Sequence, residues 1–296
     1  MSLRLLAVFS IFGYRNCLIM KNILLLTDFS EKAQNAIDYA LQFFSSNKCN
    51  FFILIVQKVS GYTTSNLMTS LTTSSVYNSI IKKPKEVLSE MVNGFEKTYK
   101  DEAYSFDGIC DYDSFLNSVN QVVISKNIDL IVMGTNGASG TKEVIFGSNT
   151  LSVIRNVDCP VLVIPENYKY KTINSIVFAV NADVKLNKKF LKPLMHIISK
   201  FNSELNILTF ENEEDIYSSK EKKIDMDDFF KGISHSFYEI ENVPIDIAID
   251  SFVQIKHVDL MATIISKESF FKRLISGSTT DEIIYNSRVP LLIMHP

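Results

Sequence analysis

The sequence lacks the residue patterns that mark several common kinds of site. It has four cysteines, Cys17, Cys49, Cys110 and Cys159, and they form no C-x-x-C pair and no metal-type spacing. Scattered cysteines of this kind are typical of a chain that stays reduced, so we expect a cytoplasmic protein. All four histidines lie in the second half, which excludes a locally assembled Cys/His or Ser/His arrangement in the first half.

An excess of positive charge and a long hydrophobic run are also absent. The 30 basic and 33 acidic side chains give a net charge of −3, so no cationic surface is available to attract DNA or RNA. The apolar residues 5–13 are too few to span a bilayer, which takes about 20 residues, and Arg4 is the only charge before them. We therefore expect no nucleic-acid partner and no membrane partner. We also expect residues 1–19 to be an extension outside the fold, which then starts at Met20.

The length and the hydrophobic pattern together indicate two α/β domains. A chain of 296 residues exceeds what one hydrophobic core usually supports. From Lys21 onward, short apolar runs alternate with helical patterns, the first of which is capped by Ser30 and Glu31. This alternation predicts a mostly parallel sheet covered by helices on both faces. The expected strands of the first half are residues 22–27, 51–56, 103–109, 129–133 and 160–164. One expected helix begins at Ser30, a second ends at about Tyr99 and a third spans residues 112–126.

The pattern restarts in the second half of the chain. Residues 175–181 resemble the first strand, and residues 204–210 resemble the second. Residues 129–166 also align without gaps on 259–296, which indicates an internal repeat. The identical pairs include Asp129/Asp259, Gly147/Gly277, Ser148/Ser278, Asn156/Asn286 and Pro160/Pro290.

A glycine-rich segment, residues 133–150, carries the strongest functional signal. It follows a buried strand and precedes a helix, the place where parallel α/β sheets bind ligands. Gly134 and Gly137 have no Cβ, so a phosphate can approach their backbone N–H groups. Gly147 and Ser148 open the next helix, whose unpaired N–H groups favour an anion. The alternative is an ordinary connection that only needs flexible glycines.

The spacing in this segment resembles the G-x-x-G-x9-G-[S/T] signature of the universal stress protein family, with Gly134, Gly137, Gly147 and Ser148 at the signature positions. It resembles neither a Walker A loop nor a G-x-G-x-x-G fingerprint. The resemblance extends from about residue 20 to the end. It implies two tandem five-stranded, mostly parallel sheets sandwiched by helices, similar to the adenine nucleotide α-hydrolases and packed as an intramolecular pseudo-dimer. The implied domains are residues 20–168 and 169–296.

The resemblance also implies a binding site for ATP or another adenine nucleotide in the first domain. Asp28 matches the family's aspartate at the end of the first strand, where it would meet ribose hydroxyls or a bound Mg²⁺. Its alternative role is to cap the helix near Ser30. Val56 matches an adenine contact and could equally be core. The implied nucleotide-binding residues are Thr27, Asp28, Val56, Met133, Gly134, Asn136, Gly137, Gly147, Ser148, Asn149 and Thr150.

The second copy departs from this pattern. Asp28 is replaced by Asn181, Gly134 by Ile264 and Gly137 by Lys267, and only Gly277 and Ser278 are retained. An isoleucine side chain would fill the space that a phosphate needs. We therefore expect no ATP in the second domain.

Three functions fit the sequence. The first is a regulatory module of the stress response, in which nucleotide changes a surface for an unknown protein partner. The second is a slow ATPase, although Lys142 is the only cation of the loop and no catalytic residue is identified. The third is a non-binding scaffold, in which strands 160–164 and 290–294 join the two halves. Further homo-association is open in all three.

Overall fold

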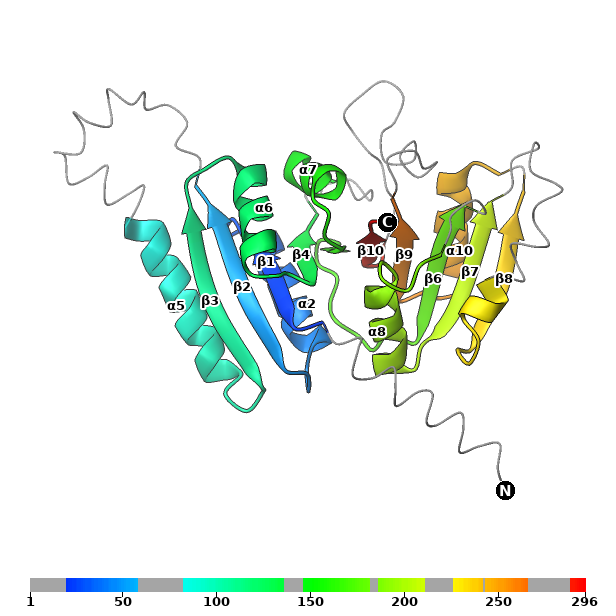
Figure 1. Ribbon diagram of the computed structural model, residues 1–296, viewed down its shortest axis with the longest axis horizontal. Coiled ribbons are helices and arrows are strands. Elements are labelled where there is room, and N and C mark those ends of the chain that lie inside the picture. Colours follow the sequence, from blue (N-terminus) through cyan, green and yellow to red (C-terminus); the bar gives the residue numbers. More distant parts are fainter. Residues whose placement is uncertain are drawn as a thin grey trace.

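The computed structural model describes residues 20–57, 82–135, 146–181, 186–210, 226–241, 243–265 and 288–296. In the first half, strands alternate with helices in the order that the sequence predicts (Figure 1). The elements are β1 (Asn22–Leu26), α2 (Glu31–Phe43), β2 (Cys49–Val56), α5 (Lys83–Thr98), β3 (Tyr104–Asp111), α6 (Phe115–Ser125), β4 (Leu130–Gly134), α7 (Ser148–Asn156) and β5 (Val161–Ile164).

The described part of the second half again contains five strands, with helices in two of the connections. A strand opens it, and a helix then leads to the next parallel strand. The elements are β6 (Ser175–Asn181), α8 (Lys192–Phe201), β7 (Glu204–Phe210), β8 (His235–Ile240), α10 (Ile245–Ile255), β9 (Leu260–Ile264) and β10 (Leu291–Met294).

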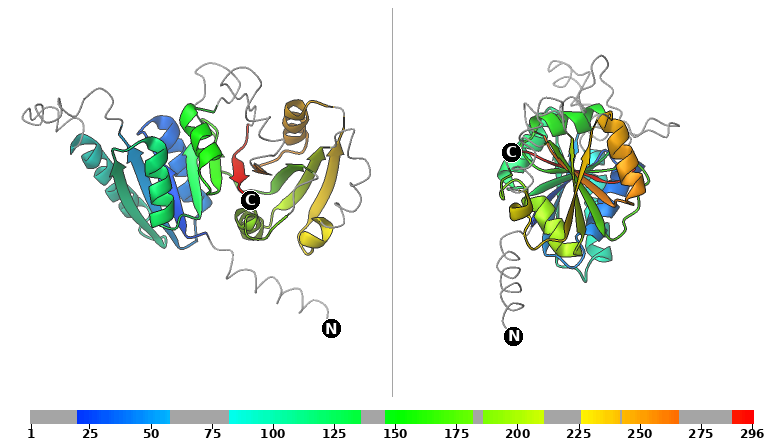
Figure 2. Two further views of the ribbon diagram at one scale, coloured as in Figure 1. Left: turned by 45° about the horizontal axis from the view of Figure 1, so that its top comes forward. Right: turned by 90° about the vertical axis from the view of Figure 1, so that its right-hand side faces the viewer.

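All these strands belong to one ten-stranded sheet with the order β3-β2-β1-β4-β5-β10-β9-β6-β7-β8. Within each half, neighbouring strands are parallel. The halves meet where β5 and β10 pair in antiparallel register, with Leu162 opposite Leu292. The strands fan out in the end-on view of Figure 2, as expected when the twist between neighbours accumulates over many strands.

Two hydrophobic layers lie on opposite faces of the sheet. Along β1, Ile23 and Leu25 face one layer, whereas Leu24 and Leu26 face the other, because side chains alternate along a strand. Helices α2, α5 and α8 contribute to the first layer, and α6, α7 and α10 contribute to the second. The fold is therefore an α/β sandwich with a mostly parallel sheet, as the sequence predicts.

Local capping sets where the helices begin. Ser30 caps α2, as predicted, because its hydroxyl accepts a hydrogen bond from the Ala33 N–H at 3.3 Å. The helix predicted over 112–126 begins only at Phe115, because the Ser114 hydroxyl accepts from the Asn117 N–H at 3.4 Å. Similarly, the strand predicted over 103–109 lies at 104–111, since its backbone pairs with the whole of β2.

An aspartate fastens the start of the first strand in each half. Asp129 Oδ2 accepts from the backbone N–H groups of Lys21 and Asn22 at 2.8 and 3.1 Å. Asp259 Oδ2 accepts from those of Asn174 and Ser175 at 2.8 and 3.0 Å. The Asp129/Asp259 identity of the repeat is therefore structural.

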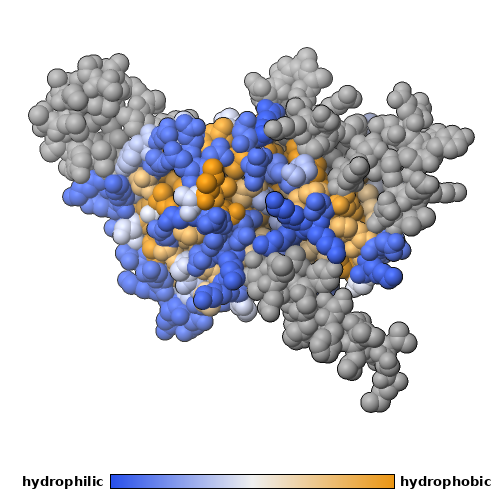
Figure 3. All heavy atoms as spheres, in the orientation of Figure 1, coloured by the Kyte–Doolittle hydropathy of each residue, from blue (hydrophilic) through white to orange (hydrophobic). Residues whose placement is uncertain are grey.

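Hydrophilic and hydrophobic surfaces are interspersed on the face shown in Figure 3. Among the described residues, a few large apolar side chains are exposed, including Ile124 of α6 and Ile255 of α10. No helix among the described residues is both long enough and apolar enough to cross a bilayer. The predicted extension, residues 1–19, lies outside the described ranges.

Candidate functional site

A small pocket lies at the carboxyl ends of the central strands of the first half. It has a volume of about 90 Å³ and is formed by the ends of β1 and β4 and the first turns of α2, α6 and α7. Helix N-termini direct free N–H groups and partial positive charge toward such a point. The lining residues are Leu26, Thr27, Asp28, Ser30, Lys32, Ala33, Phe115, Met133, Gly134, Thr135, Asn149 and Thr150.

The turn from β1 into α2 is held by its own side chains. The Thr27 hydroxyl accepts a hydrogen bond from the Phe29 N–H at 3.0 Å, and Asp28 Oδ1 accepts one from the Ser30 N–H at 3.0 Å. Phe29 takes a left-handed conformation, with φ of 64°. Asp28 therefore shapes this turn, while Ser30 caps the helix. The Asp28 side chain remains exposed at the mouth of the pocket.

Gly134 ends β4 where α2 comes very close to the sheet. A Cβ at this position would lie 3.0 Å from the Lys32 carbonyl oxygen and 3.4 Å from the carbonyl carbon. Both are backbone atoms that cannot rotate away. Packing of α2 against the end of β4 thus requires glycine at position 134, in addition to any role that this glycine has in binding a ligand.

The hydroxyl of Thr150 ties α7 to the same strand end. It donates a hydrogen bond to the Gly134 carbonyl at 3.2 Å. This bond positions the start of α7 against the end of β4. Gly147 occupies the N-cap of α7, and a glycine has no side chain with which to cap the helix.

Thr135 adds a buried polar group to the pocket. Its side chain is 2% exposed, and its hydroxyl has no hydrogen-bond partner among the described residues. An unsatisfied buried hydroxyl costs about 1–3 kcal/mol relative to a satisfied one. A polar group of a ligand would remove this cost.

Lys32 supplies a cation at the pocket. Its ammonium group lies 3.3 Å from a carboxylate oxygen of Glu166, and the two side chains are about one-third exposed, 31% and 34%. Lys32 lies in the first turn of α2, next to the point where Gly134 meets that helix.

The structure brings six of the predicted residues together around the pocket. Gly147 and Ser148 sit at the start of α7 but do not line the cavity, and Val56 packs with the apolar layer on the α6 side. Asn136 and Gly137 fall outside the described residues. The six that line the pocket are Thr27, Asp28, Met133, Gly134, Asn149 and Thr150.

Sequence reasoning missed four polar or aromatic residues of the lining: Ser30, Lys32, Phe115 and Thr135. Sequence position could have identified two of them, Lys32 and Thr135. Lys32 lies in the first turn of a helix that starts right after β1, and Thr135 directly follows Gly134. Phe115 comes from a helix start predicted three residues too early.

The second half is built differently at the equivalent point. Ile264, which replaces Gly134, ends β9 and is 1% exposed. Asn181, the counterpart of Asp28, ends β6 and pairs with Phe210. Lys267, Gly277 and Ser278 lie outside the described residues.

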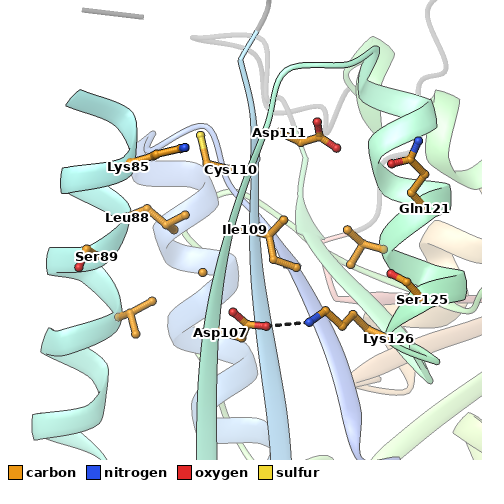
Figure 4. A pocket seen from close by; sticks show the side chains of 13 residues that line it. Lys85, Leu88, Ser89, Asp107, Ile109, Cys110, Asp111, Gln121, Ser125 and Lys126 are labelled. Atoms are coloured by element: carbon orange, nitrogen blue, oxygen red, sulfur yellow. Dashed lines mark hydrogen bonds and ion pairs between the residues drawn. The ribbon is translucent and has the colours of Figure 1, made fainter. Parts of the chain in front are cut away.

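A larger hollow, of about 700 Å³, lies along the outer strand β3 between α5 and α6 (Figure 4). Asp107 and Lys126 form an ion pair of 2.9 Å inside it, and Lys85, Asp111 and Gln121 also line it. Size alone would favour this hollow. It lies beside the outer strand β3, however, whereas the smaller pocket lies at the carboxyl ends of β1 and β4, next to the starts of three helices and a hydroxyl that has no partner among the described residues. We therefore take the smaller pocket as the candidate functional site.

The fold and this pocket define a parallel α/β protein with a site at the carboxyl ends of its strands. Residues 20–165 match the sequence model of the Universal stress protein family, and through them the chain belongs to that family. Among the described residues, no group of acidic, histidine or cysteine side chains is arranged to hold a metal ion.

Individual relatives agree with this membership. A universal stress protein of Methanocaldococcus jannaschii is 42% identical over 53 residues, which are 18% of this chain and 31% of that protein. A Staphylococcus aureus USA300 protein assigned to the same family is 29% identical over 154 residues, 49% of this chain and 83% of that protein. The crystal structure of a universal stress protein from Archaeoglobus fulgidus has a TM-score of 0.64 at 19% identity. It covers 92% of this chain and 97% of its own, so the two chains share their fold over both halves.

Proposed function

We propose that this protein is a nucleotide-dependent regulatory module of the stress response, which binds ATP or another adenine nucleotide in its first half. The observation that carries the proposal is the buried Thr135 hydroxyl, which has no partner among the described residues and lines a pocket beside the uncapped start of α7. An anionic group at this point would accept hydrogen bonds from backbone N–H groups and from the hydroxyl, and the helix dipole would stabilise its negative charge.

The pocket accommodates only part of a nucleotide. Its volume of about 90 Å³ is well below the roughly 300–1,000 Å³ of sites that enclose a whole small molecule. We assign it to the phosphate end. Asp28, at the mouth, would then meet the ribose hydroxyls or a Mg²⁺ ion, and Val56, at the end of the neighbouring strand β2, would lie on the adenine side.

We assign no nucleotide to the second half, because Ile264 fills the position of Gly134 with a buried side chain. In this proposal, residues 20–168 form the binding domain and residues 169–296 form a companion domain. The antiparallel β5–β10 pair joins them as an internal pseudo-dimer. The proposed location is the cytoplasm, in agreement with the free state of Cys49, Cys110 and Cys159.

A slow ATPase is the second candidate. Among the described residues that line the pocket, Asp28 is the sole carboxylate, and it already accepts a hydrogen bond from the Ser30 N–H. Any turnover should be slow, because this proposal assigns Asp28 to the ribose or Mg²⁺ and the described lining holds no other carboxylate that could activate water. Measuring phosphate release during the binding experiment distinguishes the two functions.

Calorimetric titration with Mg²⁺-ATP tests the proposal through its stoichiometry. We expect one site per chain. Two sites would overturn the assignment of a silent second half, and no binding would favour a scaffold without nucleotide.

The Thr135→Val variant tests the position of the site. It removes the hydroxyl and keeps the shape, so ATP affinity should fall about tenfold, since hydrogen bonds to charged groups contribute roughly 1.5–3 kcal/mol. Thr209→Val is the matched control, because Thr209 is equally buried and its hydroxyl donates to Tyr238 O at 3.4 Å in the second half. Equal affinity in Thr135→Val and the wild type would refute the assigned position.

A further inference from the structure

This inference rests on the proposed function and concerns how the same pocket is regulated. Lys32 is the only cation among the described residues that line the pocket. Its backbone carbonyl lies against Gly134, and its ammonium group lies 3.3 Å from Glu166. A phosphate in the pocket and the Glu166 carboxylate are therefore two anions within reach of one side chain.

Glu166 belongs to the segment that connects the two halves. It follows β5 and lies in a turn closed by a hydrogen bond from the Tyr168 N–H to Pro165 O at 3.1 Å. Asn167 in this turn has a left-handed backbone, with φ of 63°. The turn is thus a defined structure that begins one residue after the strand.

The same turn contacts both halves of the molecule. The Asn35 amide of α2 donates to Pro165 O and Tyr168 O at 3.4 and 3.3 Å. The Tyr168 hydroxyl donates to the Asp259 backbone carbonyl at 3.3 Å, directly before β9. Lys32 and Glu166 therefore link the pocket to a turn that touches the second half.

We propose that Lys32 exchanges partners, from Glu166 in the empty protein to a phosphate oxygen when nucleotide binds, and that this exchange reports occupancy to the turn at residues 165–168. A partly exposed ion pair contributes little stability, so it yields readily to a competitor. A phosphate carries more than one negative charge and accepts strong, charge-assisted hydrogen bonds. Glu166 thereby acts as an internal competitor that lowers affinity and loses its partner on binding.

A double-mutant cycle tests the exchange. In Glu166→Gln the competitor is neutral, and ATP should bind at least about threefold more tightly; in Lys32→Gln it should bind at least about fivefold more weakly. In the double variant, Glu166→Gln should have no effect, because its benefit acts through Lys32. An equal gain in both backgrounds would show that Glu166 acts only as a distant negative charge, and would overturn the proposal.

Two controls isolate the phosphate and the position of the charge. Adenosine has no phosphate, so all four proteins should bind it with equal affinity. Glu86→Gln removes the same charge from the Lys82–Glu86 pair on α5, and should leave ATP affinity unchanged. A response of adenosine binding to Lys32→Gln would mean that Lys32 shapes the pocket rather than binding phosphate.

Hydrogen exchange tests the report to the turn. Saturation with ATP should speed exchange of the Tyr168 amide at least about threefold in the wild type, and it should leave this exchange unchanged in Glu166→Gln. The Tyr99 amide, which donates to Phe95 O at 2.8 Å at the end of α5, is the reference and should not change. Unchanged exchange at Tyr168 in the wild type would refute the relay. If ATP bound to none of the proteins, the proposed function itself would fail, a result distinct from binding that is insensitive to Glu166.

Discussion

The two halves share a sheet topology and differ in how the first helix meets it. In the first half, only residues 27–30 separate β1 from α2, so the start of α2 lies directly against the end of β4. In the second half, residues 182–191 separate β6 from α8, and the end of β9 carries a buried isoleucine. The Gly134/Ile264 difference thus accompanies a difference in chain connection. The pocket described above lies in the half with the short connection.

The two halves share an aspartate at the opposite end of the strands. Asp129 and Asp259 each accept hydrogen bonds from two backbone N–H groups at the start of the first strand of their half, and each also forms an ion pair, with Lys192 at 3.5 Å and Lys171 at 2.7 Å, respectively. The repeat therefore keeps this structural aspartate at the amino ends of the strands, whereas Asp28 and Gly134 at the carboxyl ends are replaced by Asn181 and Ile264.

Of the substitutions that test this difference between the halves, truncation of Ile264 should change the stability of the protein most. Ile264→Ala deletes buried methyl groups and leaves a cavity, which should lower the free energy of unfolding by about 2–5 kcal/mol. Ile247→Ala, at a position that is 55% exposed on α10, is the control and should change it by less than about 0.5 kcal/mol. Denaturation by urea measures both, and similar values for the two variants would contradict the packing described for β9.

Adding a side chain at Gly134 should have the next largest effect. The new methyl group of Gly134→Ala meets backbone atoms of Lys32 at 3.0 Å, so stability should fall by about 1–3 kcal/mol. Gly94→Ala on α5 is the control, because a Cβ there has no neighbour within 4 Å and alanine favours a helix by about 1 kcal/mol. A Gly134→Ala protein as stable as the wild type would show that α2 can move away, and that the glycine serves binding alone.

A smaller, pH-dependent effect should arise where the halves touch. Lys200 of α8 donates hydrogen bonds to Ser45 O and Asn47 Oδ1 in the first half, and burial lowers the pKa of its ammonium group to about 8. Between pH 8 and about 10.5, the unfolded chain binds more protons at Lys200 than the folded protein does, so the Lys200 contribution to stability rises with pH.

The comparison with Lys200→Met isolates this contribution from other groups. The difference in unfolding free energy between the wild type and the variant should shift in favour of the wild type from pH 7.5 to pH 9.5. Circular dichroism in urea measures it at each pH. A difference that stays constant over this range would mean that Lys200 titrates at its ordinary pKa.

The sequence predicts the strands and the repeat well because both depend on local apolar patterns. Runs such as residues 51–56 and 160–164 consist almost entirely of apolar residues, as expected of strands covered on both faces. They can therefore be assigned as strands without knowledge of which strands they pair with. The glycine spacing likewise identifies the loop after β4. Thr27, Asp28 and Gly134 were found at the pocket because the ends of parallel strands meet at one edge of a sheet.

The remaining details depend on contacts between distant segments. The Lys32–Glu166 ion pair joins residues on α2 and after β5, and no spacing rule connects them. The hydrogen bond from the Thr150 hydroxyl to Gly134 O also joins separate elements, and only the three-dimensional arrangement reveals it. The sequence motif likewise does not predict that Gly134 packs against the Lys32 carbonyl, because the motif explains each of its glycines by ligand binding.

The antiparallel pairing of β5 with β10 also has a consequence for the order of events during synthesis. Parallel pairing of β5 with β4 can form as soon as the first half has left the ribosome, but its other edge stays open until β10 has been made. An open, apolar strand edge is a template for pairing with another chain. Slow translation of the second half should therefore favour nascent chains that exchange β10 between copies.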